Sequence, residues 1–225
     1  MNTIQEIYDQ YQIPPNLAQH QLRAAAAVVS WILDHWHGQS LDKEKIITAA
    51  LFHDMGNIIK FDFSPEHTPF PYTNEERVHW QSIKEEFIQK YGSDPHHATQ
   101  VIVTELGNPH GIAEIVGGLG FRNAPKFLEE IDFVSMIVQY ADMRVSPHAV
   151  TSAEARIADF YMRYEHRPDF GALYPEREKA KKAIYEIEKI LAGYTNESLI
   201  NLTEEDLLNS MSLLSQSTYA SISTA

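Results

Sequence analysis

The chain has 225 residues, of which 44% are hydrophobic, so it can bury a substantial core in one domain or in two small ones. The 31 acidic residues against 18 basic ones give a formal net charge of −13, which disfavours nucleic acids and anionic membranes as partners. The absence of cysteine excludes disulfides, cysteine-ligated zinc and thiol nucleophiles, and it indicates a reducing compartment.

The N-terminal stretch MNTIQEIYDQY lacks the basic start and apolar run of a secretory signal. No segment reaches the roughly 18 consecutive apolar residues of a membrane-spanning helix. We therefore expect a cytoplasmic protein with no membrane-embedded part. Any metal that it binds must be held by histidine and carboxylate ligands.

The first long helix is predicted to follow Pro14 and Pro15, with Asn16 as its N-cap. Apolar residues recur through it at helical spacing, namely Leu17, Ala24, Ala27, Val28 and Trp31. His20 lies on the same face. A titratable side chain is therefore expected on the buried side of this helix.

A second helix is predicted to begin near Asp42 and to end near Gly56. Its last turn carries the adjacent residues His53 and Asp54, directly after an apolar run. The segment that follows, FDFSPEHTPFPY at 61–72, contains three prolines. It is long enough to form a lid or one wall of a cleft.

More helices are predicted along the rest of the chain. Thr73 and Glu76 form a capping-box pattern ahead of a helix that Gly92 closes. The helical pattern restarts at Asp94 and stops at Gly107. The remaining predicted helices cover 112–119, 152–165, 176–192 and 203–214.

The stretch beyond Pro125 has the clearest helical period, because apolar residues and one carboxylate recur at three- or four-residue steps: Ile131, Val134, Val138 and Asp142. Asp142 therefore occupies the apolar face of a helix, as His20 does. Alternating strand patterns are almost absent, and no repeat of fixed period occurs. The sequence predicts an all-α fold, a single-domain helical bundle over 1–194 followed by a C-terminal helix and partly frayed tail in 195–225.

Four polar side chains thus lie on or beside apolar helix faces: His20, His53, Asp54 and Asp142. An unpaired carboxylate in such a place costs several kcal/mol, so these groups must find partners. Two imidazoles and two carboxylates suit a divalent ion such as Mn, Fe, Co, Ni, Zn or Mg. The sequence therefore predicts a metal site.

The order of these residues resembles the H…HD…D signature of the HD-domain superfamily of metal-dependent phosphohydrolases. NLAQHQLRAAAAV resembles the helix of the first ligand, TAALFHDMGN the run around the HD pair, and QYADMR the setting of the last ligand. The resemblance spans residues 14–148. It implies that His20, His53, Asp54 and Asp142 bind one metal ion within a bundle of five or more helices.

Dinuclear members of that family add two histidines between the HD pair and the last aspartate. Either His96 or His97 is a candidate for the first of these, but the place expected for the second, EIVGGLG, offers glycines. One ion per chain is therefore favoured. Many members also carry lysine where this chain has Asn57, and Lys60, one turn further on, is the candidate to replace it.

A divalent ion in such a site polarises a phosphoryl group and lowers the pKa of water, so the predicted reaction is hydrolysis of a phosphoester or phosphoanhydride bond. Asp54 is expected to orient the attacking water. Four side chains are candidates, by position, to stabilise charge on the phosphoryl oxygens: Arg23, Lys60, His79 and Arg144.

Relatives in the family act on nucleoside monophosphates, cyclic nucleotides, alarmones and dinucleoside polyphosphates, so the expected partner is a small, nucleotide-like phosphorylated substrate. Two alternatives stay open. One is an iron-dependent oxygenase with a dinuclear centre, and the other is a non-enzymatic, metal-retaining nucleotide-binding or regulatory module. The predicted helix at 152–165 offers a homodimer contact through Phe160, Tyr161 and Tyr164.

Overall fold

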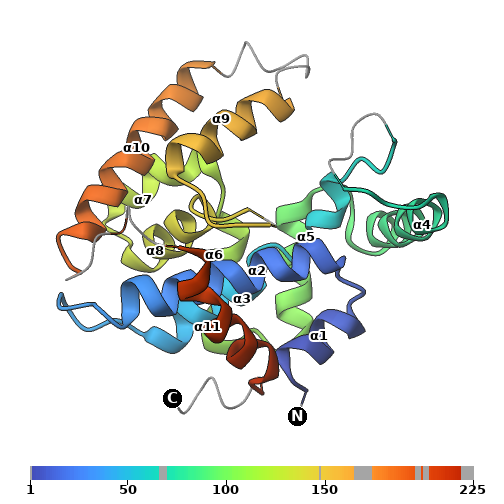
Figure 1. Ribbon diagram of the computed structural model, residues 1–225, viewed down its shortest axis with the longest axis horizontal. Helices are drawn as coiled ribbons and strands as arrows, with labels where there is room; N and C mark the ends of the chain where they lie inside the picture. The colour runs from blue at the N-terminus through green and yellow to red at the C-terminus, as the bar shows by residue number, and fades with distance from the viewer. Residues whose placement is uncertain are drawn as a thin grey trace.

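The computed structural model describes residues 2–65, 70–146, 148–164, 174–195, 199 and 203–218 (Figure 1). Over these residues the fold is all-α, as predicted, with isolated β-bridges but no strand. None of the described helices is long and apolar enough to cross a membrane. The α-helices are α1 (Ile4–Gln10), α2 (Pro15–Ala27), α3 (Lys43–Phe52), α4 (Asn74–Tyr91), α5 (Pro95–Glu105), α6 (Ala113–Gly118), α7 (Ala124–Glu130), α8 (Phe133–Asp142), α9 (Ala153–Tyr164), α10 (Tyr174–Ala192) and α11 (Glu204–Gln216).

Most helix ends lie where the sequence predicts them, because the capping residues act as expected. The Asp42 carboxylate accepts a hydrogen bond from the Lys45 N–H at the start of α3. Thr73 and Glu76 form the reciprocal capping box of α4. Gly92 ends that helix with φ of +84°, a conformation that glycine adopts without strain.

Two predicted boundaries are wrong. Helix α2 begins at Pro15 with Pro14 as its N-cap, because proline suits the first turn, where its missing N–H costs nothing. Asn16 therefore lies inside the first turn. The stretch that ends with α8 forms two helices, since Ile131 has a left-handed φ of +53° and is 68% exposed. The Asp132 carboxylate then caps α8 as a new helix.

Helix α2 lies at the centre of the bundle. Its four successive alanines, Ala24–Ala27, are completely buried. Small side chains let neighbouring helices approach closely, and α3, α8 and α11 all pack against α2. Beyond Ala27 the chain continues as a π-helix, Val28–Leu33, a variant that is frequent near functional sites.

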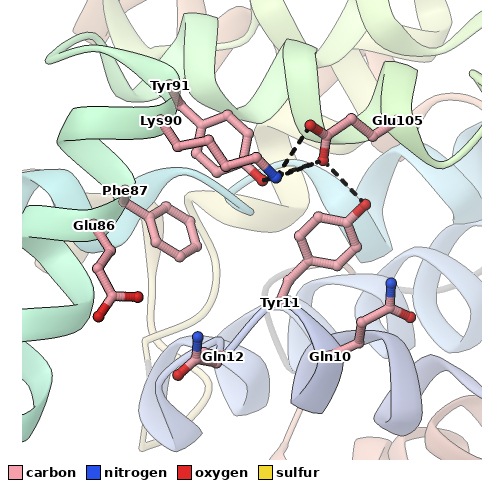
Figure 2. Close-up of a pocket in the computed structure, with 8 residues that line it drawn as sticks. All are labelled: Gln10, Tyr11, Gln12, Glu86, Phe87, Lys90, Tyr91 and Glu105. Atoms are coloured by element: carbon pink, nitrogen blue, oxygen red, sulfur yellow. Dashed lines mark hydrogen bonds and ion pairs between the residues drawn. The ribbon is translucent and has the colours of Figure 1, made fainter.

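Glu105, the last residue of α5, joins three helices (Figure 2). Its carboxylate lies 3.2 Å from Lys90 Nζ and accepts hydrogen bonds from the hydroxyls of Tyr91 and Tyr11. Burial and the neighbouring Glu105 raise the pKa of Tyr11 to about 12, so this hydroxyl keeps its proton and donates it. A pocket of about 250 Å³ lies among these side chains, and none of the predicted site residues lines it. The network connects α1 and α4 to α5.

The C-terminal helix is part of the packed bundle. Leu207 of α11 is completely buried, and the Ile4 N–H donates to the Ser217 carbonyl at 3.0 Å, which joins the two ends of the described chain. The helix predicted at 203–214 is therefore present as α11, which extends to Gln216. Residues 219–225 of the C-terminal segment lie outside the described residues, as do residues 66–69 of the segment 61–72.

The aromatic residues of α9 make contacts within the chain. The Phe160 ring lies 5.4 Å from that of Phe121, and the Tyr161 hydroxyl lies 3.4 Å from Glu178 Oε1 on α10. The side chain of Tyr164 lies outside the described residues. The face expected to offer a dimer contact is thus used partly inside the fold.

Gly56, two residues after the His53-Asp54 pair, lies against the first turn of α5. A Cβ at this position would lie 2.4 Å from the Pro95 carbonyl oxygen, closer than real Cβ contacts come. The Gly56 N–H also donates to Thr99 Oγ1 at 2.9 Å. The absence of a side chain is therefore what lets α5 approach the end of α3.

We predict that Gly56→Ala lowers the free energy of unfolding by about 1–3 kcal/mol, because the added methyl group meets backbone atoms that cannot rotate away. Gly118→Ala in α6 is the matched control, since a Cβ at that position would meet nothing within 4 Å. Urea denaturation of both variants measures the effect. Equal stability of the two variants would contradict this account of the α3–α5 contact.

Candidate metal centre

Side chains from three helices meet at one point, and we call His20, His53 and Asp142 the metal cluster. His20 lies within α2, His53 directly follows α3, and Asp142 ends α8. Asp142 Oδ1 lies 3.0 Å from His20 Nε2 and 3.7 Å from His53 Nε2. One ligand atom from each residue lies within 4.8 Å of the others. The arrangement can hold a metal ion.

Asp54 borders the metal cluster. Its Oδ2 lies 3.8 Å from His20 Nε2 and 3.7 Å from His53 Nε2. The two histidine side chains are 4% and 3% exposed, whereas those of Asp54 and Asp142 are 18% and 25% exposed. The centre is therefore buried on its histidine side and partly exposed on its carboxylate side.

The residues present fit a divalent ion. His53 Nδ1–H donates to the Ala50 carbonyl at 2.7 Å, which leaves Nε2 of the neutral ring as the nitrogen with a free electron pair. That Nε2 is buried and has no hydrogen-bond partner among the described residues. Ligand atoms at about 2.0–2.2 Å from one ion lie no more than about 4.4 Å apart, close to the spacing found here.

The carboxylates shift the pKa values of the cluster and so determine which of its groups are protonated. Burial lowers the pKa of His20, although its hydrogen bond to Asp142 opposes this. Burial also acts to lower the pKa of His53, but Asp54 and Asp142 outweigh it and raise the value to about 9. Burial alone would raise the pKa of Asp142, yet the hydrogen bond from His20 and the nearby charge of His53 hold it well below its usual value. Without an ion, His53 is therefore protonated at neutral pH.

The backbone of the His53-Asp54 pair is held from two sides. The Asp54 N–H donates to the side chain of the buried Gln21 in α2 at 3.1 Å. On the other side, Gly56 and Thr99 attach the same turn to α5. These contacts fix the turn relative to α2 and α5.

Helix α5 brings one further histidine to the Asp54 side of the centre. Burial and the charge of Lys60 lower the pKa of His96, whereas the Asp54 carboxylate opposes that shift. Lys60 is exposed at the end of the 3-10 helix Asn57–Lys60, which follows the HD pair. His97 is exposed and lines a surface groove with Gln100, Thr104 and Glu114. Of the two adjacent histidines, His96 is the one close to Asp54.

Arg23, a predicted phosphoryl contact, pairs with the C-terminal helix. Its Nη2 lies 2.7 Å from Glu204 Oε1, and its Nη1 donates to the Ser146 carbonyl at 3.1 Å. The Glu204 carboxylate also accepts from the Val150 N–H at 3.0 Å. Arg23 and Glu204 therefore fasten the loop after α8 onto α2 and α11.

Arg144 and His79 also differ from expectation. Arg144 is 2% exposed, and its guanidinium donates to the carbonyls of Thr151 and Leu199 and to the Tyr140 hydroxyl. These bonds hold it in the core, where it cannot meet a phosphoryl group. His79 is exposed, and its ring lies against Trp80. Its helix, α4, lies at the outer side of the bundle (Figure 1). Neither residue is brought to the metal cluster.

One positive charge near the centre was not predicted from the sequence. Burial has the largest effect on the pKa of His20 and lowers it, while Asp142 opposes this shift. The charges of His53 and of Arg156 in α9 lower the pKa further. The Arg156 side chain is 15% exposed and pairs with Asp159 at 3.2 Å. It lies more than 130 positions from His20 in the chain, so no spacing pattern links the two.

Only one group of metal-ligating side chains is found in the described part of the chain. A protein-family model described as HD domain matches residues 17–144. Comparisons with curated proteins and with solved structures give no match. The matched range begins three residues before His20 and ends two residues after Asp142, so it contains the whole metal cluster together with Asp54 and His96.

We predict that metal affinity rises with pH up to about pH 9. Below that value His53 carries a proton that the ion must displace, so affinity should increase about tenfold per pH unit and level off once the ring is neutral. Calorimetric titration with Mn²⁺ in buffers of different ionisation enthalpy measures the number of protons released on binding. This number should approach one proton per ion at neutral pH. Affinity that does not change between pH 6.5 and 8.5 would refute this assignment.

Proposed function

The chain belongs to the HD domain family, and from that premise we propose that it is a metal-dependent phosphohydrolase. Its substrate is a small, nucleotide-like molecule with a phosphoester or phosphoanhydride bond. The observation that carries the proposal is the His20, His53 and Asp142 cluster, which is buried on one side and partly exposed on the side of Asp54. In this proposal the phosphoryl group approaches the ion from the partly exposed carboxylate side.

The ion, once bound, supplies Lewis acidity at a phosphoryl oxygen and lowers the pKa of water. His20, His53 and Asp142 hold it, with Asp54 as the fourth ligand. These donors suit Mn, Fe, Co, Ni, Zn or Mg, and we propose one ion per chain. The Ala50 carbonyl keeps the His53 ring oriented for this task.

Asp54 has a second task in this proposal. Its carboxylate is partly exposed, and its Oδ2 is close to both histidines. A carboxylate in that place accepts a hydrogen bond from the attacking water and directs it at phosphorus. The hydrogen bond from its N–H to Gln21 keeps the residue in place while this happens.

Lys60 and His96 contact the oxygens of the phosphoryl group without forming a bond to phosphorus. Lys60 is exposed and close enough to His96 to lower the pKa of that ring. The lowered pKa keeps His96 neutral at pH 7, so it serves as a hydrogen-bonding group while Lys60 supplies positive charge. Lys60 and His96 thus have the role for which the sequence offered four candidates: Arg23, Lys60, His79 and Arg144.

The proposal is tested by assaying purified protein with Mn²⁺, Co²⁺, Ni²⁺ or Mg²⁺ against nucleoside mono-, di- and triphosphates, cyclic nucleotides and dinucleoside polyphosphates. Turnover of at least one of these, dependent on added metal, is expected. Bound metal without any turnover would instead support a regulatory module. Two irons per chain with oxygen consumption would support an oxygenase.

Asp54→Ala should lower kcat by at least about a hundredfold, because it removes both a ligand and the group that orients water. Helical content measured by circular dichroism should not change, since the Asp54 side chain is at the edge of the core. Retained turnover in this variant would rule out the role assigned to Asp54.

The adjacent pair His96 and His97 provides a matched test. His96→Ala should lower kcat/KM on the order of tenfold, the usual effect of losing one hydrogen bond to a charged group. His97→Ala should leave kcat/KM near the wild-type value, because His97 points into the groove between α5 and α6. Equal effects of the two substitutions would contradict the placement of the phosphoryl group.

A further inference from the structure

Aromatic side chains gather where the segment before α4 meets the loop after α8. Ring centroids lie 5.7 Å apart for Phe63 and Tyr72, 5.8 Å for Phe70 and Tyr72, and 5.2 Å for Phe70 and His148. We call these four residues the aromatic wall. It joins two segments that are separated by more than 70 positions in the sequence.

The aromatic wall is attached to α2 close to the metal cluster. The Tyr72 hydroxyl donates to Asn16 Oδ1 at 3.0 Å. Asn16 and His20 are four residues apart in α2, so they share a face of the helix with their Cβ atoms about 6 Å apart. One end of the wall therefore stands about one helical turn from the first histidine of the centre.

The loop that carries His148 is fixed on the other side of His20. A bridge between Val145 and Val150 closes it into a short hairpin after α8. Arg23, three residues after His20, holds this hairpin through the Ser146 carbonyl at 3.1 Å. The hairpin thus contacts α2 at Arg23 through Ser146 and contacts the wall at Phe70 through His148.

Burial decreases along the aromatic wall toward its tip. Phe63 is buried, Phe70 and Tyr72 are half-buried, and His148 is exposed. Phe70 contacts the His148 ring from the inside, so that ring forms the solvent-exposed end of the wall. A flat aromatic ring in this position suits stacking with another flat ring.

We propose that the aromatic wall is the binding surface for the nucleobase of the substrate, with His148 as the stacking ring. The inference rests on the proposed function, since it assumes that the phosphate lies at the metal cluster. It narrows the substrate class to phosphate esters that carry an aromatic base. A sugar phosphate without a base reaches the same centre but leaves the wall uncovered.

The test compares adenosine 5′-monophosphate with ribose 5-phosphate, which has the same phosphoester but no base. Wild-type protein with saturating Mn²⁺ should prefer the first in kcat/KM. His148→Ala should reduce that preference on the order of tenfold, the usual contribution of one stacked base, whereas His148→Phe should keep it. The matched control is His37→Ala, an exposed histidine whose backbone N–H bonds to the Tyr194 carbonyl and which is not part of the wall.

Two results would overturn the inference while leaving the hydrolase proposal intact. One is equal turnover of the two substrates by wild-type protein, and the other is an unchanged preference in His148→Ala. If neither compound is hydrolysed, the Kd of each is measured by calorimetry. Tighter binding of adenosine 5′-monophosphate that is lost in His148→Ala would then support the wall as a base site, and equal Kd values would overturn it.

Discussion

The meeting of two buried imidazoles and two partly exposed carboxylates at one point among apolar helices is the constraint on which this molecule depends. Each of these groups would be costly in a core if it stood alone. Asp142 is tolerated because His20 donates to it and His53 lies 3.7 Å away, and His53 keeps a proton because Asp54 and Asp142 lie close by. One divalent ion can replace that proton and balance both carboxylates, so the same arrangement that makes the core tolerable also makes it suited to a metal ion.

The surrounding scaffold fixes the helix ends that carry these groups. Alanines in α2 let α3 and α8 come close, and the bare backbone of Gly56 lets α5 approach the turn after α3. The ion pair of Arg23 with Glu204 holds the loop after α8 to α2 and α11. This scaffold leaves the carboxylate side of the centre partly exposed and the tip of the aromatic wall exposed. These are the two parts that the proposed substrate contacts.

Periodicity and capping patterns predicted the all-α fold and most helix ends, because these depend on neighbours in the sequence. The order of His20, His53 and Asp142 predicted their cluster, because polar residues on apolar faces require partners. The partners of Arg23 and Arg144 were not predicted, since Glu204 and Leu199 are distant groups that no local pattern connects to them. For the same reason the sequence could not show which of His96 and His97 lies near Asp54. Nor could it show the left-handed backbone of Ile131, which interrupts a run with helical spacing.

X-ray absorption spectroscopy of the protein loaded with Co²⁺ or Zn²⁺ tests the central claim most directly. The account predicts two imidazole nitrogens at about 2.0–2.1 Å together with oxygen ligands around a single ion. Substitution of His20 by glutamine should remove one imidazole from that shell. A shell without two imidazoles, or a second metal at about 3.5–4 Å, would contradict a mononuclear centre built from His20, His53 and Asp142.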